Sequence, residues 1–125
     1  MDDLSGLDRE ELFDYLIEVG QNYDKKDWVE DKHLVPGCTS NIWLRVTNAD
    51  PVQIECCAES LIVRGYCYLI TELVNGKRKV DLETFDITSY ITTNNLGVGT
   101  VQTRSNAFLN VWNTMLDRVK SYSGL

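Results

Sequence analysis

Apolar residues recur every three or four positions in three stretches of the chain, and this spacing predicts three helices. The first stretch follows a capping box at residues 8–11 and stops at Gly20. The second covers residues 61–74, is capped by Ser60 and is apolar almost all round, which is typical of a central helix. Gly65 lies inside it and costs about 1 kcal/mol relative to alanine, so it predicts a close approach by another element.

The third stretch predicts a long C-terminal helix with its cap at Thr103 or Ser105. Its apolar stripe consists of Phe108, Val111, Trp112, Met115, Leu116 and Val119. Shorter apolar runs predict one or two short helices at residues 80–85 and 87–91.

Two further runs are rich in β-branched, aliphatic and aromatic residues and predict strands at residues 41–47 and 52–58. The residues between them, Asn-Ala-Asp-Pro, favour a turn, so an antiparallel hairpin is the simplest connection. Trp43 lies on the opposite face of the first strand from Ile42, and both faces therefore carry apolar side chains. We expect a helix to cover part of the second face.

The whole pattern predicts an α+β fold in which a small antiparallel sheet packs against helices. Residues 21–32 are polar and are interpreted as a surface connection that Trp28 holds to the body of the protein. A chain of 125 residues can bury one core without disulfides or metal ions, so residues 1–125 are interpreted as a single domain.

The formal net charge of −7 argues against general nucleic-acid binding, which needs a basic face. No stretch approaches the roughly 20 apolar residues of a membrane span, so no membrane association is expected. The first residues lack the basic start and apolar core of a signal peptide. These features predict a cytoplasmic protein, where thiols are kept reduced.

Cys38 lies on a predicted tight turn, Val-Pro-Gly-Cys-Thr-Ser at residues 35–40, directly before a strand. A thiol in this position can be both held and reached, and we take it as a candidate working thiol; from the residues alone a packing role is equally open. Cys56 and Cys57 are adjacent in a strand and Cys67 lies in the apolar helix, so these three are expected to be core residues. No two cysteines have CxxC spacing.

Three other side chains could contribute to chemistry. His33 is the single histidine, five residues before Cys38, and a surface position is favoured over a Cys–His pair. Arg104 lies near the start of the last helix, where it could stabilise a thiolate or persulfide, although a solvated arginine is the simpler interpretation. Arg64, in the apolar helix, must find a partner or a route to water.

Several separate blocks, in this order and spacing, resemble the SufE family of sulfur-acceptor proteins, which includes CsdE. The resemblance covers about residues 8 to 120. Its blocks are Leu-Ile-Glu-Val-Gly at 16–20, Val-Pro-Gly-Cys-Thr-Ser at 35–40 with Trp43, Ile-Val-Arg-Gly at 62–65 and Thr-Arg-Ser-Asn at 103–106.

This resemblance implies a compact α+β domain similar to the IscU scaffold proteins. It implies an accessory protein, not an enzyme, that activates a cysteine desulfurase of the SufS or CsdA type and accepts its persulfide sulfur. The family's acceptor cysteine aligns with Cys38, and its motif arginines align with Arg64 and Arg104. The sulfur would pass to an iron–sulfur scaffold or another acceptor. No cofactor or metal is expected in this chain, because pyridoxal phosphate (PLP) is expected in the desulfurase.

Two alternatives remain open at this stage. An IscU-like iron–sulfur or zinc scaffold would use Cys38 with Cys56 or Cys57 and with Cys67 or His33. Ser40, close after Cys38, is a poor metal ligand. A thiol hydrolase would instead depend on His33.

Overall fold

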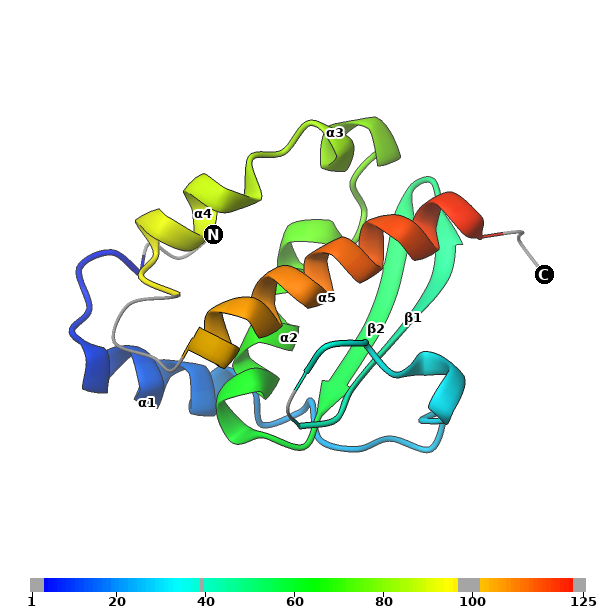
Figure 1. The fold of residues 1–125 in the computed structure, drawn as a ribbon. Helices are drawn as coiled ribbons and strands as arrows, with labels where there is room; N and C mark the ends of the chain where they lie inside the picture. The colour runs from blue at the N-terminus through cyan, green and yellow to red at the C-terminus, as the bar shows by residue number, and fades with distance from the viewer. Residues whose placement is uncertain (1–3, 39, 97–101, 123–125) are drawn as a thin grey trace.

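The computed structural model describes residues 4–38, 40–96 and 102–122, with the backbone alone for residues 102–106. Its α+β architecture, with one two-stranded antiparallel sheet and a long C-terminal helix, confirms the predicted fold class (Figure 1). In chain order the elements are α1 (Arg9–Val19), the 3-10 turn η1 (Asp31–His33), β1 (Ile42–Ala49), β2 (Val52–Ala58), α2 (Leu61–Val74), α3 (Lys79–Glu83), α4 (Ile87–Thr93) and α5 (Gln102–Ser121).

The helix boundaries follow local sequence signals closely. Asp8 and Glu11 form the predicted capping box of α1, and the Ser60 hydroxyl accepts from the Val63 N–H at 3.4 Å at the start of α2. The last helix begins earlier than predicted, at Gln102, so Thr103 and Ser105 lie inside it. The residue before Gln102 lies outside the described part of the chain.

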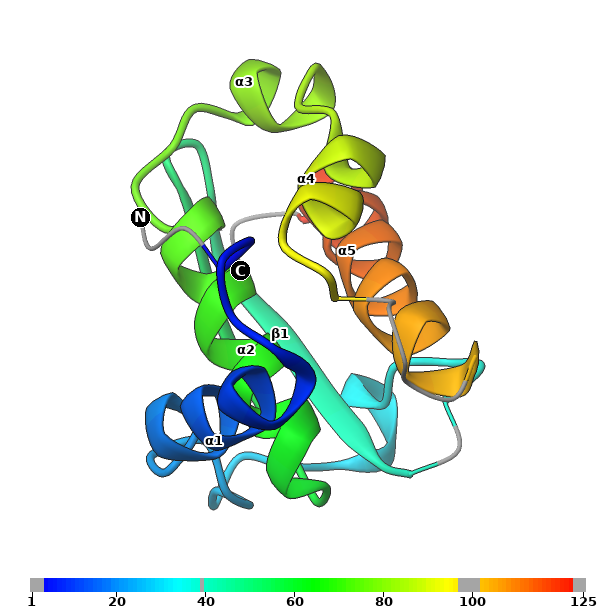
Figure 2. The ribbon, with the colours of Figure 1, turned by 90° about the vertical axis from the view of Figure 1, so that its left-hand side faces the viewer.

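The hairpin of β1 and β2 supplies one wall of the core. Its register pairs Ile42 with Ala58 and Leu44 with Cys56, and a bulge follows Val46. The face that carries Leu44 is buried, with β1 in contact with α5 and β2 in contact with α2. The two long helices therefore lie against the same side of the hairpin (Figures 1 and 2).

The opposite face of the hairpin is covered by the connection after α1. Trp43 is 6% exposed, and the Lys25 ammonium lies 6.0 Å from the centre of its ring. The guanidinium of Arg45 lies 4.8 Å from the ring of Trp28, as expected for a residue that holds the connection in place. Among the described residues, these contacts to the second face come from an irregular segment that contains the 3-10 turn η1, so the expectation that a helix covers part of this face is not confirmed.

The α1–α2 contact is a backbone contact that depends on two glycines. A Cβ atom on Gly65 would lie 2.6 Å from both the Cβ and the carbonyl oxygen of Leu16, and one on Gly20 would lie 2.6 Å from the Gly65 nitrogen. The predicted close approach at Gly65 is therefore confirmed. The fit brings α1 close against α2, and Leu12 and Leu16 of α1 belong to the buried core (Figure 2).

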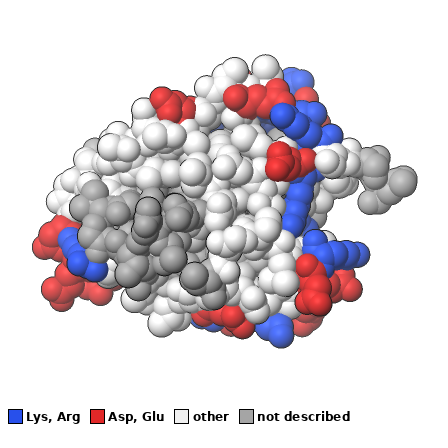
Figure 3. Space-filling model, viewed as in Figure 1, with Lys and Arg blue, Asp and Glu red and all other residues white. Residues whose placement is uncertain are grey.

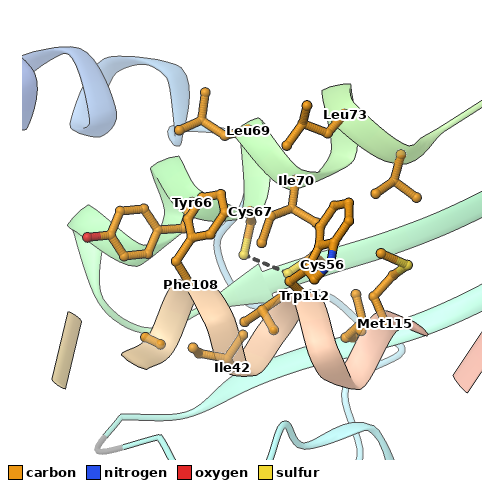
Figure 4. Packing of buried hydrophobic residues seen from close by; sticks show 14 of the residues in the cluster. Ile42, Cys56, Tyr66, Cys67, Leu69, Ile70, Leu73, Phe108, Trp112 and Met115 are labelled. Carbon is orange, nitrogen blue, oxygen red and sulfur yellow. Dashed lines mark hydrogen bonds between the residues drawn. The ribbon is translucent and has the colours of Figure 1, made fainter. Parts of the chain in front are cut away.

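Aromatic and aliphatic side chains from α2, α5 and the hairpin form the core (Figure 4). Tyr66 and Phe108 meet edge to face with ring centres 5.3 Å apart, and Trp112 is 1% exposed. Cys56 and Cys67 lie at the junction of β2 with α2, in the same cluster. The expectation that Cys56, Cys57 and Cys67 are buried is confirmed.

Candidate functional site

The segment before Cys38 is attached to the outer edge of β1. The Val35 N–H donates to the carbonyl of Ile42 at 2.9 Å, and Leu34 forms an isolated antiparallel bridge with Trp43. Val35 is 5% exposed, so the chain enters the turn from a buried position. Gly37 then adopts a φ of +82°, a left-handed conformation that favours glycine. The turn is therefore anchored at its start and leads directly to Cys38.

The Cys38 side chain is half-buried and packs against the hydrophobic core. Burial raises the pKa of its thiol; a hydrogen bond with the Asn110 side chain acts in the opposite direction, and Cys56 adds a smaller increase. The net effect is an increase above the ordinary value. In the free protein Cys38 is consequently a thiol at neutral pH, sheltered on one side and open on the other.

Asn110 is a site residue that the sequence did not reveal. Its Nδ2 donates to the Gly37 carbonyl at 3.2 Å, and its side chain also hydrogen-bonds to Cys38. A Cβ atom on Gly37 would lie 3.0 Å from this Nδ2. Asn110 is half-buried and lies next to Val111 of the apolar stripe, and a polar residue in that place was the one available signal. One amide thus holds the turn and favours the Cys38 thiolate.

Arg118 is the second site residue that the sequence did not reveal. Its guanidinium donates to three backbone carbonyls, those of His33 at 2.9 Å, of Leu34 at 2.6 Å and of Leu44. Burial lowers its pKa, whereas Cys56 has a smaller effect in the opposite direction. Arg118 therefore fastens both the segment that leads to Cys38 and strand β1 to helix α5.

The two predicted arginines occupy different places. Arg64 is half-buried, and its Nε donates to the carbonyl of Ala58 at 2.9 Å, which joins the first turns of α2 to the end of β2. Arg64 is not among the described groups that shift the pKa of Cys38. The bond to Ala58 supports a structural role for Arg64. An electrostatic effect of Arg64 on Cys38 stays a prediction. Arg104 lies near the start of α5, and its side chain is outside the described residues.

His33 and Cys57 are not among the described groups that shift the pKa of Cys38. His33 meets the ring of Trp28 edge to face at 5.5 Å, and its Nε2 lies 3.9 Å from a carboxylate oxygen of Glu30. Burial, followed by Lys32, lowers the pKa of His33. Cys57 lies on the opposite face of β2 from Cys56, where burial raises the pKa of its thiol.

The described residues offer no support for the scaffold alternative. Within residues 4–38, 40–96 and 102–122, no group of three or more His, Cys, Asp or Glu side chains is placed to hold a metal ion. A tetrahedral site needs several such ligands at about 2 Å from the metal. The Sγ atoms of Cys56 and Cys67 lie close together, but they contact each other inside the core and form only a pair.

Comparison with known proteins decides the family. A family model described as "SufE: Fe-S metabolism associated domain" matches residues 1–119. The chain belongs to the SufE family. It is 27% identical over 85 residues to an "Uncharacterized SufE-like protein" from Haemophilus influenzae. The alignment covers 65% of this chain and 68% of the relative.

A solved structure shares the fold of this SufE-family protein. The solution structure of a hypothetical protein from Thermus thermophilus matches with a TM-score of 0.74 and 14% sequence identity, over 94% of this chain and 88% of that one. At that identity the match bears on the fold alone.

Membership of the SufE family gives the chain a sulfur-transfer role in iron–sulfur metabolism, as an accessory domain that works with cysteine desulfurases. None of the described helices has the length and apolar character needed to cross a membrane.

Replacing Asn110 with alanine is expected to raise the pKa of Cys38, because the substitution removes the hydrogen bond that opposes the effect of burial. At pH 7.5 the thiolate fraction, and with it the rate of alkylation by iodoacetamide, should fall roughly tenfold. The midpoint of the rate against pH measures the pKa apart from any change in accessibility. Asn113→Ala is the matched control, since Asn113 is exposed on the same helix. An unchanged midpoint in Asn110→Ala would contradict the assigned role.

Proposed function

We propose that Cys38 accepts persulfide sulfur from a PLP-dependent cysteine desulfurase of the SufS or CsdA type, stimulates that enzyme, and passes the sulfur on for iron–sulfur cluster assembly. The observation that carries the proposal is the setting of Cys38 within the SufE-family chain. It is a half-buried thiol on an anchored turn, with one polar partner, Asn110, that favours its thiolate. The proposal assigns PLP to the desulfurase.

The proposed step is a thiol exchange. The Cys38 thiolate attacks the outer sulfur of the desulfurase persulfide, the sulfur–sulfur bond of the donor breaks, and the donor cysteine leaves as a thiolate. Cys38 then carries the persulfide, and its proton has passed to solvent or to a base of the partner. The rate of such an exchange follows the thiolate fraction and nucleophilicity of the attacking sulfur and the pKa of the leaving thiol.

Partial burial of Cys38 suits this role. A persulfide or thiolate that stands free in solution is open to oxidation and to reduction by other thiols. The raised pKa keeps Cys38 protonated in the free protein, and a basic or hydrogen-bond-donating group of the docked partner can stabilise the thiolate when it forms. In this proposal the chain is inert by itself and reacts when the partner is bound.

The surface around α5 is compatible with a docked partner. On the face shown in Figure 3, Lys, Arg, Asp and Glu side chains lie mainly toward the edges, and the area drawn white between the grey residues and the charged right-hand edge carries few of them. The core of a protein–protein interface is typically depleted in charged residues, with charge left at the rim. We therefore assign the desulfurase contact to this face.

The test is to incubate the purified protein with a SufS-type desulfurase and cysteine and to map added sulfur by mass spectrometry. The wild type should carry it on Cys38, and Cys38→Ser should carry none and should fail to stimulate the desulfurase. Cys57→Ala is the matched control and should behave as the wild type, since Cys57 is fully buried on the other face. Full stimulation by Cys38→Ser, with sulfur found on another cysteine, would refute the proposal.

A further inference from the structure

Two cysteines outside the sulfur-acceptor site face each other in the core. The Sγ atoms of Cys56, in β2, and Cys67, in α2, lie 2.7 Å apart and share a hydrogen bond (Figure 4). A disulfide bond is about 2.05 Å long, so the two sulfurs need to move little to bond. They are 5% and 1% exposed and belong to two contacting elements of the core, β2 and α2. A packing role explains why both cysteines are buried. It does not explain why their Sγ atoms point toward each other at 2.7 Å.

One of the two cysteines also borders a cavity. A cavity of about 670 Å³ lies between β2, α2 and the connection after α1, and Cys56 is the one cysteine among the described residues that line it. Tyr23, Tyr68 and Lys26 form part of its wall. A small polar molecule can therefore approach Cys56 from this side, whereas Cys67 lies behind it. Cys56 can therefore react first with a molecule in the cavity, and Cys67 is placed to attack the oxidised Cys56 sulfur and form a disulfide.

We propose that Cys56 and Cys67 form a reversible disulfide when the protein meets a small hydroperoxide such as hydrogen peroxide. In the first step the Cys56 sulfur attacks one peroxide oxygen, the oxygen–oxygen bond breaks, and Cys56 becomes a sulfenic acid as one water is released. In the second step the Cys67 sulfur attacks the Cys56 sulfur, the sulfur–oxygen bond breaks, and a second water leaves. Two thiols are oxidised, one peroxide is reduced, and a dithiol reductant reverses the change.

The order of the two steps follows from access to the cavity, which Cys56 lines and Cys67 does not. Burial and the adjacent Cys56 also raise the pKa of Cys67, which disfavours Cys67 as the first nucleophile. Cytoplasmic disulfides are typically transient and used in sensing, and a pair whose sulfurs already lie 2.7 Å apart fits that use. The disulfide would join β2 to α2 next to the α5 helix that holds the Cys38 turn.

The experiment uses the full chain as Cys38→Ser, so that oxidation of Cys38 cannot obscure the result and the outcome is independent of the proposed sulfur transfer. The reduced protein is treated with hydrogen peroxide, denatured, alkylated and analysed by peptide mass spectrometry. We expect one intramolecular bond, Cys56 to Cys67, that dithiothreitol removes. Because the bond lowers the conformational entropy of the unfolded chain, it should also raise Tm by about 10 °C, even though the loop that it closes is short.

Two further variants separate this pair from a generally oxidisable core. Cys67→Ala should form no disulfide, and dimedone should instead trap a sulfenic acid on Cys56. Cys57→Ala, which changes the neighbouring buried cysteine on the other face, should still form the bond. The proposal is overturned if Cys56 and Cys67 both remain alkylatable at a peroxide dose that fully oxidises Cys38 in the wild type, or if Cys56 bonds to Cys57.

Discussion

Replacing Arg118 with methionine is expected to lower the free energy of unfolding by about 3 kcal/mol, because a hydrogen bond to a charged group is worth about 1.5–3 kcal/mol and three bonds to one guanidinium are not additive. Methionine keeps the apolar part of the side chain but leaves the carbonyls of His33, Leu34 and Leu44 without this donor. Leu44 is 0% exposed, so water reaches its carbonyl poorly. Urea unfolding followed by tryptophan fluorescence measures the loss.

The matched control is Lys120→Met on the same helix. Lys120 is exposed, and its replacement is expected to change the free energy of unfolding by less than about 0.5 kcal/mol. Arg118→Met should also increase the rate at which Cys38 is alkylated at high pH, since the segment before the turn loses its attachment to α5. If Arg118→Met matched Lys120→Met in both measurements, the three hydrogen bonds would not be holding this segment.

Replacing Gly65 with alanine is expected to destabilise the protein by about 3 kcal/mol, at the upper end of the range for overpacked sites. The new Cβ atom would lie 2.6 Å from the backbone oxygen of Leu16, and the backbone of α1 cannot turn away as a side chain could. Helix α1 must then move off α2. The higher helix propensity of alanine, about 1 kcal/mol, offsets only part of the cost.

Gly6→Ala serves as the control for Gly65→Ala, since a Cβ atom on Gly6 would have no neighbour within 4 Å. Its stability should stay within about 0.5 kcal/mol of the wild type. Thermal unfolding followed by circular dichroism compares the two variants. A stability of Gly65→Ala equal to or above that of the wild type would show that the α1–α2 contact tolerates separation.

Local signals explain why most of the fold could be predicted from the sequence. The capping boundaries of α1 and α2 depend on residues within four positions of one another, and the hairpin depends on one short turn. Gly65 could be interpreted because an interior glycine is costly unless something lies close. The start of α5 was less well predicted because serine and threonine are also tolerated inside a helix.

Asn110 and Arg118 could not be predicted because their partners are backbone atoms far away in the sequence. Asn110 bonds to a carbonyl 73 residues away, and the carbonyls that Arg118 contacts are 74 to 85 residues away. Backbone carbonyls carry no residue identity, so no sequence pattern marks them as partners. The pairing of Cys56 with Cys67 likewise depends on how α2 lies over β2, which periodicity does not specify.

Helix α5 holds the Cys38 turn at two points of unequal strength. Arg118 and Asn110 are eight residues apart along α5, or about 12 Å, with three hydrogen bonds at the first point and one amide at the second. A pulling force on the turn would therefore release Asn110 well before Arg118. If the Asn110 contact were broken, the base of the turn would still be fixed by the bonds from Arg118 to His33 and Leu34 and by the bond from Val35 to Ile42, so the distance that Cys38 could travel toward a donor sulfur would be limited to the reach of the residues after Val35.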